Sequence, residues 1–160
     1  MKVLFQKIYE DYLSKLQDYP EKDAKAAIQL QQIFYRMTKY FIENFNTANF
    51  LTEALYRSKA ASYFTNYRVQ HFIFVRTLIE QAQREGDICS DMNSYEIYTT
   101  LQSILIQPII IKNNILQQHK NEPLMDKLKL IDVSSESSLQ KRLRIAFKGL
   151  RPLSLIHISE

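Results

Sequence analysis

The chain contains only two glycines, Gly86 and Gly149, and this scarcity constrains its fold more than any other feature. Glycine adopts the left-handed backbone conformation that closes helices and tight hairpins more easily than any other residue. Two glycines leave none for a series of hairpins, for a phosphate-binding loop or for a dinucleotide fingerprint. Because each glycine follows a long helical pattern, the sequence predicts an all-helical protein in which both glycines mark helix ends.

Helical periodicity runs through almost the whole chain. Apolar residues recur at intervals of three and four, which is typical of amphipathic helices. Asn93 and Glu96 form a variant of the capping box and predict a helix start, and Pro108 predicts a kink in that helix. The expected helices span about 1–19, 21–45, 48–56, 59–85, 94–118 and 135–149, with a short apolar segment at 124–131.

Composition excludes several classes of protein. With 160 residues, 46% of them apolar, the chain is long enough for one domain with a buried core and too apolar to be disordered. The net charge of +4 permits an acidic partner without requiring one. The longest apolar run, 104–111, is broken by Gln107 and Pro108 and is far shorter than the roughly 20 residues that span a bilayer. We therefore expect a cytoplasmic protein that does not enter a membrane.

The sequence offers no support for catalysis, a metal site or a cofactor. Cys89 is the single cysteine, which excludes an internal disulfide and a multi-cysteine metal site. His71 and His119 are the only histidines before residue 153, and neither has a carboxylate pair or a nucleophile motif beside it. We therefore predict a protein that is not an enzyme and that binds no metal or cofactor.

Three joints between the expected helices carry a resemblance to a known family. Residues 2–5 read Lys-Val-Leu-Phe, residues 83–88 read Gln-Arg-Glu-Gly-Asp-Ile, and residues 147–152 read Phe-Lys-Gly-Leu-Arg-Pro. In this order they resemble the K-x-x-L-F, G-Q-x-x-G-E-I-R-x-D and G-L-x-P junctions in the C-terminal domain of TetR-family transcription regulators. Asp91 fits the second junction, whereas Asp87 stands where the family usually has glutamate.

The resemblance implies a fold and a function. The expected fold is an all-α bundle of about six helices, in which 94–118 and 135–149 form the dimer face. Residues 1–152 would be the effector-binding and dimerisation domain of a bacterial TetR-type regulator, with repression as the expected action. Its partners would be a second copy of the chain and a small apolar or aromatic effector.

The resemblance also concerns the two ends of the sequence. Operator DNA would be contacted only through an N-terminal helix-turn-helix of about 45 residues, which we expect to be missing before Met1. No residue of this chain is therefore assigned to DNA binding. Residues 153–160 resemble the translated read-through of a sequencing adapter and are left out of the fold prediction.

Aromatic side chains gather on the two longest expected helices and predict a ligand pocket. Pockets between helices are commonly lined by aromatic side chains, with a few polar groups that fix the ligand's orientation. For any single one of these residues plain core packing is the commoner role, and for His71 a satisfied core histidine is the simpler interpretation. The predicted pocket residues are Phe34, Phe41, Phe64, Tyr67, His71, Thr99 and Gln102.

The expected dimer face follows the apolar stripes of the last two long helices. In a single chain these stripes would stay partly exposed, so we expect two helices from each subunit to form an intersubunit four-helix bundle. The predicted interface residues are Ile97, Leu101, Leu105, Ile109, Leu139, Leu143, Phe147 and Leu150.

Two further features have simple explanations. Basic residues at helical spacing on the last helix can bind phosphates, but here they lie opposite the apolar stripe and are better explained as a solvated face. These basic residues are Lys141, Arg144, Lys148 and Arg151. The thiol of Cys89 lies near Asp87 and Asp91 in the sequence, and this negative charge argues against the lowered pKa that a redox sensor needs.

Two other functions stay open. The main alternative is a stand-alone helical protein-interaction module with no ligand, and a weaker one is an enzyme on a helical bundle. The gene sequence before Met1 distinguishes them, because an in-frame helix-turn-helix favours the regulator. A stop codon and ribosome-binding site directly before Met1 favour the module.

Overall fold

The structure is a computed structural model of the chain, and it describes residues 2–17, 20–57 and 61–152. Within these ranges the side chains at 2, 4–5, 16–17, 51–52, 54–57 and 61–70 are not described. Every regular element in the described ranges is a helix, which confirms the predicted all-α class. The helices there are α1 (Lys2–Gln17), α2 (Ala26–Glu43), α3 (Phe45–Arg57), α4 (Ala61–Arg84), α5 (Ser94–Leu105), α6 (Gln107–Gln118), α7 (Leu124–Lys129) and α8 (Glu136–Gly149).

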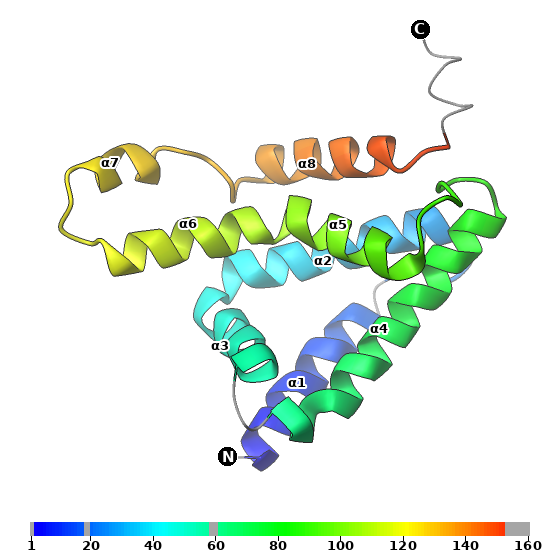
Figure 1. Cartoon of the computed structure of the whole chain (residues 1–160), viewed down its shortest axis with the longest axis horizontal. Helices are drawn as coiled ribbons and strands as arrows, with labels where there is room; N and C mark the ends of the chain where they lie inside the picture. The colour runs from blue at the N-terminus through cyan, green and yellow to red at the C-terminus, as the bar shows by residue number, and fades with distance from the viewer. Residues whose placement is uncertain (1, 18–19, 58–60, 153–160) are drawn as a thin grey trace, which may run out of the picture.

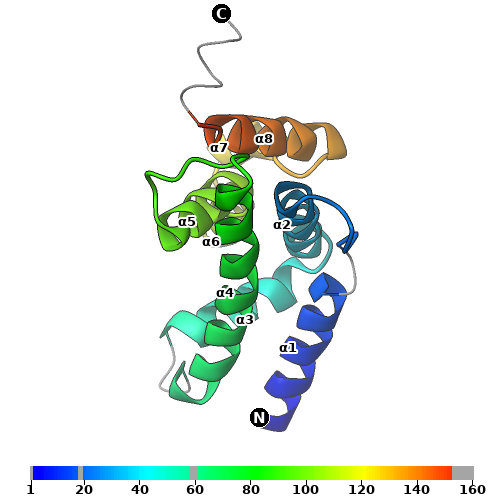
Figure 2. The ribbon, with the colours of Figure 1, turned by 90° about the vertical axis from the view of Figure 1, so that its right-hand side faces the viewer.

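The helices are arranged around the contact between α2, α5 and α8. Helices α5 and α6 run almost end to end, and α8 crosses over α5 and α2 on one side of the molecule (Figures 1 and 2). Helices α1 and α4 extend away on the opposite side, where α1 contacts both α2 and α4. Helix α3 packs on α2 and α4, and the short α7 packs on α6.

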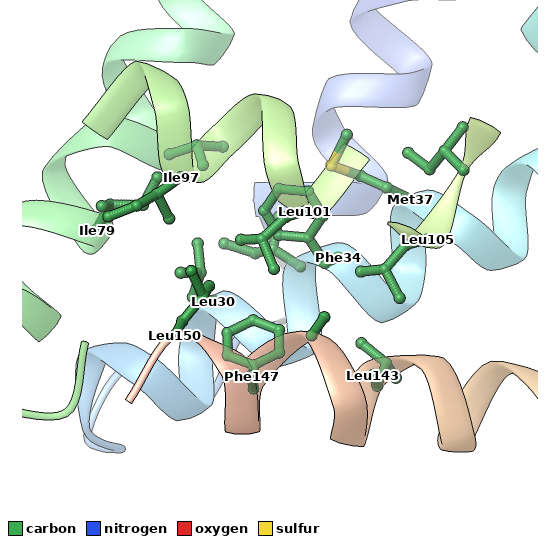
Figure 3. Packing of buried hydrophobic residues seen from close by; sticks show 14 of the residues in the cluster. Leu30, Phe34, Met37, Ile79, Ile97, Leu101, Leu105, Leu143, Phe147 and Leu150 are labelled. Atoms are coloured by element: carbon green, nitrogen blue, oxygen red, sulfur yellow. The ribbon is translucent and has the colours of Figure 1, made fainter. Parts of the chain in front are cut away.

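The core lies where α2, α5 and α8 meet (Figure 3). Leu30 and Phe34 on α2 and Leu101 on α5 are completely buried, and Phe147 on α8 packs into the same cluster. Each such side chain contributes about 1.5–3 kcal/mol when it is fully removed from water. Burial against α2 therefore holds α8 onto the rest of the chain.

Gly86 closes α4 as the sequence predicts. Its φ of 78° is the left-handed conformation, and no other described residue has a positive φ. The amide of Gly86 donates to the carbonyl of Gln83 (3.1 Å), and the amide of Asp87 donates to the carbonyl of Ala82 (3.0 Å). These two bonds make a Schellman motif, which satisfies carbonyls that the end of the helix would leave without partners.

The loop after Gly86 is held by one side chain of α4. Gln83 Nε2 donates to the carbonyls of both Cys89 and Met92, each at 2.8 Å. The amide of Cys89 donates to the carbonyl of Leu150 at 2.7 Å, which ties the loop to the end of α8. The loop between α4 and α5 is therefore held by hydrogen bonds to Gln83 on α4 and to Leu150 at the end of α8.

The predicted capping box at the start of α5 is confirmed. Asn93 Oδ1 accepts from the amide of Glu96 (2.9 Å), and Glu96 Oε2 accepts from the amide of Asn93 (2.8 Å). Two amide donors at the start of the helix are satisfied in this reciprocal way, which fixes where α5 begins.

Pro108 produces a break rather than a kink. The amide of Ile109 donates to the carbonyl of Ile106 (3.0 Å), and α5 ends at Leu105 while α6 begins at Gln107. The carbonyl of Leu105 accepts instead from Nη2 of Arg142 on α8 (3.2 Å). Because the amide of Ile109 bonds to Ile106, the carbonyl of Leu105 loses its helical donor, and the guanidinium of Arg142 donates to it instead.

Two details of the prediction need correction. Gly149 is the last residue of α8 but does not have a left-handed conformation, so it does not close the helix as Gly86 does. The residue after it, Leu150, keeps a right-handed conformation (φ −87°, ψ −3°), so the chain leaves α8 without a left-handed residue. Where the prediction has about six helices, the described ranges contain eight, since Pro108 divides one helix and 124–129 forms its own.

Two parts of the prediction concern residues that the structure does not describe. The predicted boundary at 18–19 and the predicted artefact tail at 153–160 lie outside the described residues. The prediction of a domain over 1–152 stays a prediction.

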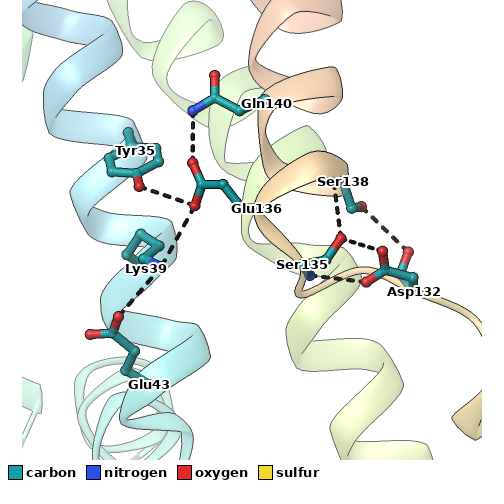
Figure 4. Close-up of polar contacts among 8 residues, drawn as sticks. All are labelled: Tyr35, Lys39, Glu43, Asp132, Ser135, Glu136, Ser138 and Gln140. Carbon is teal, nitrogen blue, oxygen red and sulfur yellow. Dashed lines mark hydrogen bonds and ion pairs between the residues drawn. The ribbon is translucent and has the colours of Figure 1, made fainter.

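A polar network links α2 to the start of α8 (Figure 4). Glu136 accepts from the hydroxyl of Tyr35 (3.1 Å) and lies 3.6 Å from Nζ of Lys39. Asp132 accepts hydrogen bonds from Ser135, whose side chain caps α8 by accepting from the amide of Ser138 (3.1 Å). The network is exposed, so it orients α8 more than it stabilises it.

Candidate functional site

His71, near the middle of α4, is the most unusual polar side chain in the described structure. It is only 6% exposed, and neither Nδ1 nor Nε2 has a hydrogen-bond partner within the described structure. Leaving a buried donor or acceptor unsatisfied costs about 1–3 kcal/mol. A buried polar group of this kind needs an explanation beyond core packing.

Aromatic rings from two other helices surround His71. Its ring lies 6.3 Å from that of Tyr12 on α1 and 6.1 Å from that of Tyr98 on α5, measured between centroids. The Tyr98 ring also meets Phe34 on α2 (6.0 Å) and Phe72 on α4 (5.5 Å), both edge to face. We call these five residues, His71, Tyr12, Tyr98, Phe34 and Phe72, the aromatic cluster. It joins four helices at one place.

Burial determines the charge of His71. Removal from water lowers the pKa of His71 from its usual 6.5 to about 4. The imidazole is therefore neutral at pH 7, so one ring nitrogen donates and the other accepts. Thr38 is the only other buried polar side chain in the described part, and its hydroxyl donates to the carbonyl of Phe34 (2.7 Å). The interior around the cluster thus holds no buried charge among the residues described.

Comparison with known proteins identifies no family. Neither a protein-family model, nor a curated protein, nor a solved structure matches this chain. The function is therefore inferred from the geometry of the site and from the residues at the helix junctions.

The structure brings some of the predicted pocket residues together and separates others. His71 and Phe34 lie in the aromatic cluster, and Gln102 Nε2 donates to the hydroxyl of Tyr98 (2.8 Å) at its edge. Phe41 is buried on α2, whereas the side chains of Phe64 and Tyr67 lie outside the described residues.

Thr99 is placed differently from the expectation. Its hydroxyl donates to the carbonyls of Tyr95 (3.0 Å) and Glu96 (3.1 Å) on its own helix. A hydroxyl bonded to its own helix backbone has no donor to offer a ligand. Thr99 therefore contributes no donor to the aromatic cluster in this conformation.

Three members of the cluster, Tyr12, Phe72 and Tyr98, are absent from the predicted pocket residues. A signal for Tyr98 exists, because Gln102 follows it at the interval of four that brings two side chains together on a helix. No sequence pattern predicts that Tyr12, from a distant helix, meets the same histidine.

The eight predicted dimer residues are all buried within the single chain. Helix α2 and its neighbours already cover the stripes of α5 and α8, so no second copy is needed to remove them from water. The expectation that these stripes stay exposed in one chain is wrong for Ile97, Leu101, Leu105, Ile109, Leu139, Leu143, Phe147 and Leu150. If two copies of the chain contact each other through these helices, the contact must use side chains on the exposed faces of the helices.

The remaining features agree with their simpler explanations. The basic stripe of α8 is exposed along its whole length, at Lys141, Arg144, Lys148 and Arg151. Burial and the neighbouring Asp91 raise the pKa of the Cys89 thiol, which is the opposite of what a redox sensor needs.

The described residues contain no group of three or more His, Cys, Asp or Glu side chains placed to hold a metal ion. None of the described helices combines the length and hydropathy needed to cross a membrane.

Proposed function

We propose that this chain is the effector-binding and dimerisation domain of a TetR-type transcription regulator that acts in the cytoplasm. The observation that carries the proposal is the buried, unpartnered His71 inside the aromatic cluster. A purely structural core gains nothing from two unsatisfied ring nitrogens, whereas a ligand site needs polar groups that stay available. The junction of Gln83 and Gly86, followed by a helix broken at Pro108, supports the same proposal through its resemblance to the family.

The cluster offers a route from ligand to DNA-reading domain. In the proposed full-length protein the DNA-reading helices precede α1, and Tyr12 on α1 meets His71 directly. A ligand at His71 therefore contacts α1 as well as α4 and α5. If it binds one position of α1 more tightly than another, it shifts the equilibrium between two arrangements of the DNA-reading domains.

Dimerisation, in this proposal, uses the outward faces of the last helices. Three large apolar side chains there are exposed, namely Tyr95 on α5 (63%), Ile111 on α6 (54%) and Ile145 on α8 (63%). Exposed apolar side chains on neighbouring helices are typical of faces that a second copy covers. The partner proposed for this face is a second copy of the chain.

Light scattering on the purified chain tests the dimer directly. We expect the wild-type chain to be a dimer at high micromolar concentration and Ile145→Glu to be a monomer with an unchanged melting temperature. The matched control is Ile28→Glu, which puts the same charge on an exposed apolar position of α2 (45% exposed) and should stay dimeric. A wild-type chain that is strictly monomeric under these conditions would refute the dimerisation part.

The alternative function is a stand-alone helical interaction module with no ligand. Exposed apolar side chains around α7 favour it, because Leu124 (68%), Leu130 (84%) and Ile131 (55%) offer a surface to another protein. The gene sequence before Met1 separates the two proposals. An in-frame helix-turn-helix supports the regulator, and a stop codon with a ribosome-binding site supports the module.

A further inference from the structure

Three described side chains have a buried polar atom without a hydrogen-bond partner, those of His71, Asp87 and Arg142, and His71 is the one among them whose whole side chain is buried. Thr38 donates to the carbonyl of Phe34 on its own helix, whereas both ring nitrogens of His71 lack a partner in the described structure. One nitrogen of a neutral imidazole is a hydrogen-bond acceptor of good strength. A molecule that reaches His71 and donates one hydrogen bond would satisfy it.

The surroundings of His71 limit the charge that such a molecule can carry. No Asp, Glu, Lys or Arg is buried among the side chains that the structure describes. An anionic ligand would need a buried cation, which the neutral His71 does not supply, and a cationic ligand would need a buried carboxylate. Among the described side chains neither charge would find a buried partner, and a charge desolvated without one is disfavoured.

The aromatic rings next to His71 favour an aromatic ligand. The rings of Tyr12 and Tyr98 lie 6.3 Å and 6.1 Å from the imidazole and are tilted 49° and 68° to it. Aromatic rings prefer tilted or edge-to-face neighbours at such distances, and an aromatic ligand can make the same contacts. A saturated ligand of the same size would not gain this contribution.

We propose that the aromatic cluster binds an uncharged planar aromatic molecule that carries one hydrogen-bond donor, a phenol, whose hydroxyl donates to His71. The inference rests on the proposed function, because it names the chemical class of the effector. It goes beyond that function because it fixes which molecules are excluded: aromatic carboxylates, arylalkylammonium ions and hydrocarbons without a donor.

Three probes of one shape test this selectivity on the intact chain. We would measure dissociation constants for para-ethylphenol, ethylbenzene and para-ethylbenzoate by NMR titration, following the ring protons of Tyr98 and Phe72, which are present in the wild-type chain and in every variant. We expect para-ethylphenol to bind about tenfold more tightly than ethylbenzene, as one net hydrogen bond of about 1.4 kcal/mol requires. The charged para-ethylbenzoate should bind at least about a hundredfold more weakly than the phenol.

Two variants locate the preference. His71→Leu should lower the affinity for para-ethylphenol to that for ethylbenzene while leaving ethylbenzene unchanged. His119→Leu is the matched control, because His119 is an exposed histidine directly after the end of α6, paired with Glu122 at 2.8 Å, and should change neither affinity. The comparison of three probes on the wild-type chain needs no variant, so it stands even if His71→Leu folds poorly.

The results separate this inference from the proposed function. Equal affinities for the phenol and ethylbenzene, tighter binding of the benzoate, or no binding of any probe would overturn the phenol class. If the chain is then still a dimer with a helix-turn-helix encoded before Met1, the regulator proposal survives without it. A tenfold preference lost in His71→Leu supports the phenol class, even in a chain that proves monomeric.

Discussion

Replacing His71 by leucine should change how the stability of the chain depends on pH. His71 stays neutral in the folded chain because burial lowers its pKa to about 4, whereas in the unfolded chain it titrates near 6.5. Between these two values the unfolded chain binds more protons, so the free energy of unfolding falls as the pH falls. The contribution of His71 is complete above pH 6.5 and is lost as the pH drops through about 4.

The size of the effect follows from the two pKa values. The gap between 6.5 and about 4, at about 1.36 kcal/mol per pH unit, makes the whole effect about 3 kcal/mol. Between pH 7 and pH 4.5 the wild-type chain should lose about 2 kcal/mol more than His71→Leu does. At pH 7 the leucine variant should be at least as stable as the wild type, because it removes an unsatisfied polar group.

Urea unfolding from pH 7 to pH 4.5 measures this difference. Carboxyl groups with lowered pKa values, such as Asp132 and Glu136, also destabilise the fold in acid, but they are exposed and act equally in both proteins. The difference between wild type and variant therefore isolates His71. A difference that stays constant over this range would refute the claim that His71 is buried and neutral.

Four further changes test the helix junctions, each by urea unfolding. Gly86→Ala forces a left-handed alanine and should cost about 1 kcal/mol, whereas Gly149→Ala, in a helical conformation with nothing within 4 Å of the added Cβ, should gain up to about 0.5 kcal/mol. Gln83→Ala removes both hydrogen bonds to the loop after α4 and should cost about 1–2 kcal/mol, with faster amide exchange in that loop. Arg142→Met removes the donor at the break between α5 and α6 and should cost about 1 kcal/mol.

Neighbouring residues supply the controls for these changes. Gln81→Ala, on the exposed side of the same helix as Gln83, should change stability by less than about 0.5 kcal/mol, since its bonds are local and exposed. Arg144→Met, on the exposed face of α8, should change nothing measurable. Equal losses in a variant and its control would mean that general helix propensity, and not the junction contact, sets the stability.

Local signals in the sequence predicted the helix ends well. Gly86 and the pair of Asn93 and Glu96 act within a few residues of the chain, so their effect does not depend on how the helices pack. Pro108 was predicted to bend a helix, and whether a proline bends or divides one depends on which donors lie near the freed carbonyls. Here Arg142 lies near Leu105, a contact across 37 residues that no local pattern contains.

The sequence did not predict which helices pack against one another. An apolar stripe shows that a helix face will be covered, but it does not show by what. The stripes that include Leu101 and Leu139 were assigned to a second copy, and the structure covers them with the chain's own helices. The aromatic cluster depends on the angles at which α1, α4 and α5 meet, which explains why Tyr12 and Tyr98 were missed.

The acid sensitivity of the fold and the proposed ligand class concern the same nitrogen. A phenol hydroxyl that donates to His71 occupies the acceptor that a proton would otherwise take, so ligand and proton compete for it. Binding of the phenol to the neutral form should therefore lower the pKa of His71 below about 4 and move the loss of stability to lower pH. Ethylbenzene, which binds without using the nitrogen, should stabilise the chain without moving that pH. A ligand that only fills space cannot produce this difference, so the pH of unfolding with each probe distinguishes a hydrogen bond to His71 from packing around it.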